Sequence, residues 1–285
     1  LDCISLFGFG AGLHLYSDTG DVHNILVEGC VVACAGVTAL PWDSNPYYHN
    51  IVEGGGAYTM TGLEFKTNFT YHPRGGGGSL AYGLNIGYGG TIASPVVTNN
   101  VLWSPDANGA YLRIGGLSGT PTITGNNFYG LAAGFSPATY PSNTYETISP
   151  QPSGVRVFVR PNAYETGRGH VIVYNPALGS SVSVDLSTVL AVNDTYKVFD
   201  AMNPFTAILT GTYGGGSVTF PMNLTPVLAP AGLSAPAHTH PRFGAFIVQK
   251  TGSAAPAGEV DSDAFNRADS TSLGTTVGGG TWVKF

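Results

Sequence analysis

One pattern of apolar residues, polar residues and an asparagine recurs along the first half of the chain. It occurs four times, with decreasing likeness toward the N-terminus, at Pro121–Gly130, Pro95–Trp103, Leu63–Tyr71 and Ile25–Val32. The aligned positions are Cys30, Asn68, Asn100 and Asn126, so the copies are 38, 32 and 26 residues apart. A repeat of variable length predicts units that stack on one another, with the extra residues placed in loops. Ile4–Gly8 is expected to align with Asn126–Gly130, so the chain would begin inside a coil.

A second series of short segments alternates apolar and polar residues, which is typical of half-buried strands. Its members are Gly12–Tyr16, Gly36–Leu40, Gly83–Gly87 and Ala110–Gly115. Two strand segments per repeat, without helical periodicity, predict an all-β fold, a parallel β-helix of about five coils over residues 1–148. Asparagine suits the corner of a coil because it tolerates left-handed backbone angles and can form a hydrogen-bonded ladder with its copies.

Composition limits the classes of partner. Of 285 residues, 41 are Gly and 19 are Pro, and only 10% are charged, as in all-β proteins rich in turns. The net charge is −6 and there is no basic run, which argues against nucleic acid and anionic membrane as partners. No apolar run reaches the roughly 18 residues that a membrane-spanning helix needs.

Cysteine and histidine spacings give little support for a metal site. The cysteines are Cys3, Cys30 and Cys34, an odd number without a CxxC pair. Cys30 takes a ladder position and is expected to be a small buried residue, with a disulfide to Cys3 or Cys34 as the alternative. His238 and His240 have the spacing of metal ligands on a strand but no third ligand at a recognisable distance, so we expect no metal there.

The pattern changes after residue 148. Residues 149–154 are expected to be a linker, and residues 155–250 an antiparallel β-sandwich. The seven strand segments that predict the sandwich are Val155–Val159, His170–Tyr174, Ser181–Asp185, Tyr196–Phe199, Thr206–Leu209, Ser217–Phe220 and Phe243–Val248. Residues 251–260 read as a flexible linker, and residues 261–285 as the start of a further module.

Two insertions, at residues 41–58 and 72–79, interrupt the repeat and are expected to flank one face of the β-helix. Loops on a rigid scaffold concentrate binding residues, and Trp and Tyr rings suit contacts with sugars. We therefore expect a trough that binds sugar rings along this face. Its substrate-binding residues would be Trp42, Tyr47, Tyr48, Tyr16 and Asn85, with Thr38, His14 and Arg113 on the same outward strip.

The repeats of residues 1–148 resemble the right-handed parallel β-helix superfamily of pectate lyases, polygalacturonases and phage tailspikes. Arg160–Pro176 resembles the start of β-sandwich domains appended to β-helices in bacterial secreted proteins and found in glycosidases. Phe265–Asp269, with Leu273, Gly274 and Trp282, resembles the opening of concanavalin-like or laminin-G-like jelly rolls, which bind glycans. These resemblances imply an extracellular or cell-surface protein that handles carbohydrate.

Cleavage of a polysaccharide would require a paired acid and base. The best candidates are Arg113 and His14 with Glu64 or Asp43, and Lys66 is an alternative base. Calcium, which the resemblance to pectate lyases makes a possible cofactor, needs about six converging oxygen ligands, and the acidic residues of 1–148 are scattered. The cofactor therefore stays unknown.

Two functions are consistent with these features. The first is a secreted modular protein whose β-helix groove binds a polysaccharide or surface glycan and cleaves it by lyase or glycoside hydrolase chemistry. The alternative is a non-catalytic, spike-like adhesin or structural protein. Two carboxylates beside Arg113 or Lys66 would favour the enzyme, and a groove without them would favour the binding protein.

Overall fold

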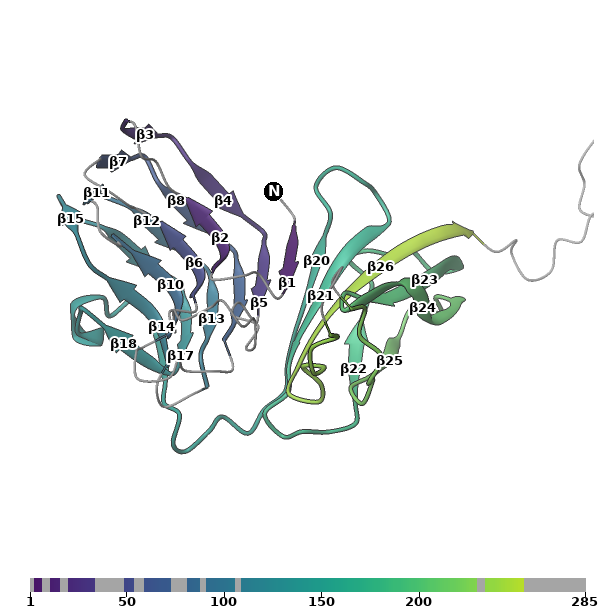
Figure 1. The fold of residues 1–285 in the computed structure, drawn as a ribbon. Coiled ribbons are helices and arrows are strands. Elements are labelled where there is room, and N and C mark those ends of the chain that lie inside the picture. The colour runs from purple at the N-terminus through teal and green to yellow at the C-terminus, as the bar shows by residue number, and fades with distance from the viewer. Residues whose placement is uncertain are drawn as a thin grey trace, which may run out of the picture.

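The computed structural model describes residues 3–6, 11–15, 20–33, 49–53, 59–72, 81–87, 91–105, 109–229 and 234–253. Within them the chain is all-β, with four parallel sheets followed by two antiparallel sheets (Figure 1). The expected module at residues 261–285 lies outside the described residues. Strand β26 reaches Ser253 because its end pairs with β23, so the first three residues of the expected 251–260 linker are strand.

The parallel strands form four sheets, which we call A to D. Sheet A contains β1 (Ile4–Leu6), β5 (Val31–Ala33), β9 (Phe69–Tyr71), β13 (Val101–Trp103), β17 (Asn127–Tyr129) and β19 (Thr144–Glu146). Sheet B contains β2 (Ala11–Leu15), β6 (His49–Glu53), β10 (Ala81–Ile86), β14 (Gly109–Ile114) and β18 (Leu131–Ala133). Sheet C contains β3 (Val22–His23), β7 (Thr59–Thr61), β11 (Thr91–Ala93) and β15 (Leu117–Ser118). Sheet D contains β4 (Leu26–Glu28), β8 (Glu64–Lys66), β12 (Val96–Thr98) and β16 (Thr122–Thr124).

The chain passes through sheets A, B, C and D in turn and then returns to A, so the predicted parallel β-helix is confirmed. A coil has four strands, whereas the sequence pattern indicated two. The asparagine-containing repeat spans a strand of sheet D and the following strand of sheet A, and the second series falls on sheet B. The strands of sheet C are two or three residues long, too short to show an alternating pattern.

The asparagines form a continuous ladder at the corner between sheets D and A. Each rung donates its backbone N–H to the side-chain oxygen of the next rung, from Cys30 to Asn68 at 2.9 Å, Asn68 to Asn100 at 2.8 Å and Asn100 to Asn126 at 2.9 Å. Asn143 extends the ladder by accepting from the Asn126 N–H at 2.9 Å. The expectation that these positions stack along one axis is confirmed.

The side-chain amides of the ladder are also satisfied. Each Nδ2 donates to a carbonyl of the preceding coil, from Asn68 to Val27, Asn100 to Phe65 and Asn126 to Val97, at 2.9, 2.9 and 2.8 Å. These three asparagines are at most 1% exposed. A buried amide without partners destabilises a fold, so the register of the coils is specified by polar contacts as well as by the apolar core.

The residue before each rung turns the chain from sheet D into sheet A. Gly29, Thr67, Asn99 and Gly125 have φ values of 68°, 50°, 57° and 69°. This left-handed conformation is easy for Gly and Asn but unusual for a β-branched residue such as Thr67. Inside the coils, apolar side chains from all four sheets form one core, which includes Val32, Met60, Phe65, Leu84, Ile92, Leu102 and Phe128.

The first coil differs from its predicted alignment by one residue. Ile4 pairs with Val31, and the same row of sheet A ends at Asn127 and Thr144. Ile4 therefore corresponds to Asn127, and Cys3 takes the ladder position that was assigned to Ile4. Because neighbouring residues of a strand point to opposite faces, the shift turns Ile4 out of the coil, where it packs near the sandwich.

Sheet B differs from its predicted alignment in one coil. The expected strand at Gly36–Leu40 lies outside the described residues. The place of that coil in sheet B is taken by β6, whose Ile51 lies between Leu13 and Leu84 in register.

Strands are present at all seven segments expected in the second half. They are β20 (Arg156–Pro161), β21 (Arg168–Tyr174), β22 (Ser181–Asp185), β23 (Asp194–Asp200), β24 (Asn203–Thr212), β25 (Ser217–Pro221) and β26 (Phe243–Ser253). One antiparallel sheet has the order β20-β21-β26-β23-β24, and β22 and β25 form a second. The core between these two sheets includes Val173, Val184, Val198, Phe220 and Phe246.

The other face of the five-stranded sheet packs on the outer face of sheet A, as Figure 1 shows for β20 and β21 beside β1 and β5. Tyr71 stacks on Phe243 with ring centroids 4.6 Å apart, and Trp103 lies 4.5 Å from Tyr174. The Tyr174 hydroxyl is fully buried and donates to the Thr70 carbonyl at 3.0 Å. An aromatic layer therefore joins the two halves of the molecule.

Strand β20 shows how the sequence divides its residues between the two packing faces. Val157 and Val159 face the core of the sandwich, whereas Phe158 belongs to the aromatic layer. Arg156 contacts both carboxylate oxygens of Glu146 at 2.6 Å, and Arg160 donates to the Thr67 hydroxyl at 3.2 Å. The sandwich thus covers the outer face of sheet A.

Replacing Asn100 with alanine should strongly destabilise the β-helix. The change removes the acceptor for the buried Asn68 N–H and leaves the Phe65 carbonyl without its donor. We expect the free energy of unfolding to fall by about 3 kcal/mol in a urea titration. The control is Thr98→Ala on β12, which should change it by less than about 1 kcal/mol. Equal losses in the two variants would contradict a stabilising role of the ladder.

Replacing Trp103 with alanine should destabilise the contact between the β-helix and the sandwich. Trp103 is 3% exposed and touches Tyr71, Tyr129 and Tyr174. Thermal or urea unfolding should show a loss of about 3–5 kcal/mol. The control is Phe205→Ala, because Phe205 is 80% exposed and its removal should have little effect. A Trp103 variant as stable as the control would show that the aromatic layer does not hold the two halves together.

Candidate functional site

The outward strip expected on sheet B exists as a row of residues in register. His14 lies beside Val52, Val52 beside Asn85, and Asn85 beside Arg113. His14 is therefore two coils from Asn85, as the sequence predicted. Only the backbone of β2 at His14 is described, so the place of the imidazole is not assigned.

Arg113 and Asn85 are in direct contact. Arg113 Nη1 donates to Asn85 Oδ1 at 3.0 Å, and the guanidinium carbon lies 5.7 Å from the centre of the Tyr82 ring. Arg113 is half-buried, and the ring and the amide hold its planar group in one orientation. Tyr82, which the sequence pattern did not single out, is the second residue of β10, the strand that carries Asn85. Its place one coil away from Arg113 becomes visible only once the register is known.

Asn85 is more buried than the sequence predicted. It was expected as an exposed contact residue of the trough, but its side chain is 0% exposed. Its Oδ1 is satisfied by Arg113, while its Nδ2 has no hydrogen-bond partner within the described part of the chain. A buried amide hydrogen without a partner is unusual and marks this position as one where a further acceptor would be stabilising.

Glu64 does not lie on the strip. It belongs to β8 of sheet D, where its carboxylate forms an ion pair with Lys66. The proposed set of Arg113, His14 and Glu64 is thus divided between two faces of the β-helix. Asp43, Trp42, Tyr47, Tyr48 and Tyr16 lie outside the described residues, so their expected roles stay predictions.

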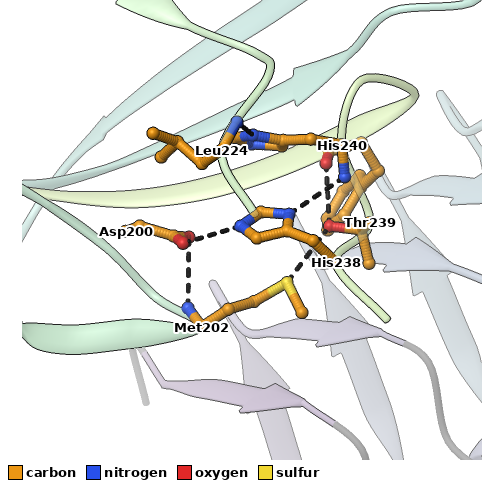
Figure 2. A network of polar contacts seen from close by, with 7 residues as sticks. Asp200, Met202, Leu224, His238, Thr239 and His240 are labelled. Carbon is orange, nitrogen blue, oxygen red and sulfur yellow. Dashed lines mark hydrogen bonds and ion pairs between the residues drawn. The ribbon is translucent and has the colours of Figure 1, made fainter. Parts of the chain in front are cut away.

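A second polar cluster lies in the sandwich, at the end of β23 and in the segment before β26 (Figure 2). His238 Nε2 lies 2.8 Å from Asp200 Oδ2, and His238 Nδ1 accepts the backbone N–H of His240 at 3.0 Å. An acceptor at Nδ1 fixes the neutral tautomer with the proton on Nε2, which donates to Asp200. The other carboxylate oxygen of Asp200 accepts the Met202 N–H at 3.1 Å.

His240 is held beside His238, with ring centroids 4.0 Å apart. Its Nδ1 accepts the backbone N–H of Leu224 at 3.2 Å. Burial, followed by the nearby His238, lowers the pKa of His240 to about 4. Both nitrogens of His238 are used in local bonds, so this cluster acts as a clip that ties the 234–242 segment to the sheet. It does not present a free base to a substrate.

The described residues contain no group of three or more His, Cys, Asp or Glu side chains arranged to hold a metal ion. A helix long and apolar enough to cross a membrane is likewise not found in this part of the chain.

The fold defines a protein of the β-helix type, with stacked parallel strands and an antiparallel β-sandwich packed on one face. Comparison of the chain with protein-family models, with curated proteins and with solved structures finds no match.

The histidine clip should make stability depend on pH. The pKa of His240 is about 4 in the folded protein and 6.5 in an ordinary setting, so the unfolded chain binds more protons between these values. The His240 contribution is fully present above pH 6.5 and is lost as the pH falls toward 4, by on the order of 2–3 kcal/mol. Urea titrations across this range should show a shallower pH dependence for His240→Asn. His23→Asn, at an exposed histidine, should keep the dependence of the parent protein. An unchanged slope in His240→Asn would contradict a buried neutral imidazole.

Proposed function

We propose that the sheet B face of the β-helix binds an acidic polysaccharide or surface glycan. The main support for the proposal is the environment of the Arg113 guanidinium, which is oriented by Asn85 and Tyr82 rather than by a carboxylate. Of the side chains that the structure describes on sheet B, none is a carboxylate. A positive group that is held in place and has no anionic partner among these residues is suited to an anionic ligand.

The chemistry of the cluster favours sugar acids over neutral sugars. A guanidinium matches the geometry of a carboxylate or sulfate group through two parallel hydrogen bonds. The Tyr82 ring supplies an apolar surface of the kind that packs on a sugar ring. Asn85, whose side chain is buried, contributes by orienting Arg113 through its Oδ1. Trp42, Tyr47, Tyr48 and Tyr16, which the sequence predicts as sugar contacts, stay in the proposal.

We propose that the protein binds the glycan, and the proposal does not include cleavage of the glycan. Lyase and hydrolase mechanisms need an acid and a base on either side of the bond that breaks. Among the described carboxylates of the β-helix, Glu64 pairs with Lys66 and Glu146 pairs with Arg156, and neither lies on sheet B. Catalysis by Arg113 and His14 with Asp43 is therefore a separate prediction that the binding proposal does not require.

The second candidate function is a structural one, in which the β-helix and sandwich form a rigid unit of a surface protein. It is favoured by the aromatic layer between sheet A and the sandwich, which fixes the two parts with buried contacts such as Tyr71 with Phe243. Both candidates place the protein outside the cell or on its surface, and they differ in whether the sheet B face has a ligand.

Replacing Arg113 with alanine should weaken binding to acidic polysaccharides. Loss of a charged hydrogen bond corresponds to about a 10–100-fold rise in the dissociation constant. The measurement is an array of acidic and neutral glycans followed by calorimetry on the best ligand, at two salt concentrations. Arg168→Ala, at an arginine of the sandwich that pairs with Glu165, should bind as the parent protein does.

Equal affinity of the Arg113 variant and the parent would refute the role of this face. No binding to any glycan would favour the structural function. The same incubations, monitored for unsaturated products and for new reducing ends, would detect cleavage.

A further inference from the structure

The first two rungs of the ladder are cysteines. The Cys3 carbonyl accepts the Val31 N–H at 2.8 Å, just as the Cys30 carbonyl accepts the Phe69 N–H at 2.8 Å. Cys3 therefore occupies in its coil the position that Cys30, Asn68, Asn100 and Asn126 occupy in theirs. The backbone N–H of Cys30 still donates to Asn68, so the polar ladder begins at Cys30 and the thiols continue it by one coil.

The two thiols are in contact. Their sulfur atoms lie 2.8 Å apart, with Cys30 buried and Cys3 exposed. Neighbouring parallel strands are about 4.8 Å apart, and the β1 and β5 residues that follow the cysteines pair in register. Disulfides join Cα atoms separated by roughly 4.4–6.8 Å, so stacked rungs meet this requirement without a change in the backbone.

A thiol pair cannot replace an asparagine pair as a hydrogen-bonded rung, because a thiol is a weak donor and a weak acceptor. The first coil is consequently attached to the second without the strong polar side-chain link that joins the later coils. A covalent bond at this position would restore that link.

We propose that Cys3 and Cys30 form a disulfide that closes the first coil of the β-helix. Oxidation removes two protons and two electrons from the pair of thiols, and a small-molecule disulfide such as oxidised glutathione accepts them. The sulfur of Cys3, the more exposed residue of the pair, attacks the reagent and releases one glutathione. The Cys30 sulfur then attacks the mixed disulfide and releases the second.

The reduced pair should react slowly. The hydrogen bond that the Cys3 thiol donates to Cys30, together with partial burial, raises the pKa of the Cys3 thiol above its ordinary value. Because the thiolate is the attacking species, oxidation at neutral pH should be slow and should accelerate as the pH rises. Cys34 lies outside the described residues and is the natural competitor, so the test must separate the three cysteines.

The test uses the whole 285-residue chain. The protein is incubated with oxidised glutathione, free thiols are alkylated, and peptides are analysed by mass spectrometry without reduction. We expect a peptide pair joined through Cys3 and Cys30, lighter by two hydrogens than the reduced pair, with Cys34 alkylated. Cys34→Ser should form the same link, and the oxidised protein should melt at a higher temperature than the reduced protein. In Cys3→Ser the two melting temperatures should agree.

Alkylation of both Cys3 and Cys30 after oxidation would overturn the proposal. A disulfide that contains Cys34 would overturn it as well. Neither result bears on glycan binding by sheet B, because the thiol pair lies at the corner between sheets D and A.

Discussion

The hydrogen-bonded ladder at the corner between sheets D and A sets the register of the β-helix. Strands of three residues cannot specify their own pairing, and a shift by one residue would turn every side chain to the opposite face. The ladder prevents this because each asparagine binds the preceding coil twice. Its side-chain oxygen accepts a backbone N–H of that coil, and its Nδ2 donates to a carbonyl of the same coil. With the register fixed, inward positions form one apolar core and outward positions form the aromatic layer on sheet A and the Arg113 strip on sheet B.

The sandwich occupies one face of the β-helix. Its central sheet is buried on both sides, by β22 and β25 on one side and by sheet A on the other. Strand β21 is accordingly buried from Gly169 to Tyr174, without the alternation of a strand that has one face in water. Sheet A is therefore an interface, and Arg113, Asn85 and Tyr82 lie on a neighbouring sheet whose position this interface helps to fix. This division of faces supports a binding surface on a rigid scaffold.

Much of the fold was predictable from the sequence because repeats and period-2 alternation are local. The ladder positions from Cys30 to Asn126, the members of the sheet B row other than β6, and the seven later strands followed from these patterns. The packing of the sandwich on sheet A was not predicted, although the continuous apolar runs Phe69–Tyr71 and Val101–Trp103 indicate strands buried on both faces. The one-residue shift at Ile4 was missed because a single coil carries no asparagine to mark its register. The shared row of Arg113 and Asn85 implied that they are neighbours but not that their side chains are in contact. The placement of Glu64 on a different sheet could not be predicted, because the sequence does not show how many sheets a coil has.

Hydrogen exchange of the ladder amides tests the central claim most directly. The backbone N–H groups of Asn68, Asn100 and Asn126 can be followed by NMR in asparagine-labelled protein. If the ladder holds the coils in register, these amides should exchange only through global unfolding, as slowly as core amides such as those of Val97 and Leu102. Exchange as fast as that of exposed turn residues would show that the coils are held by their apolar core alone.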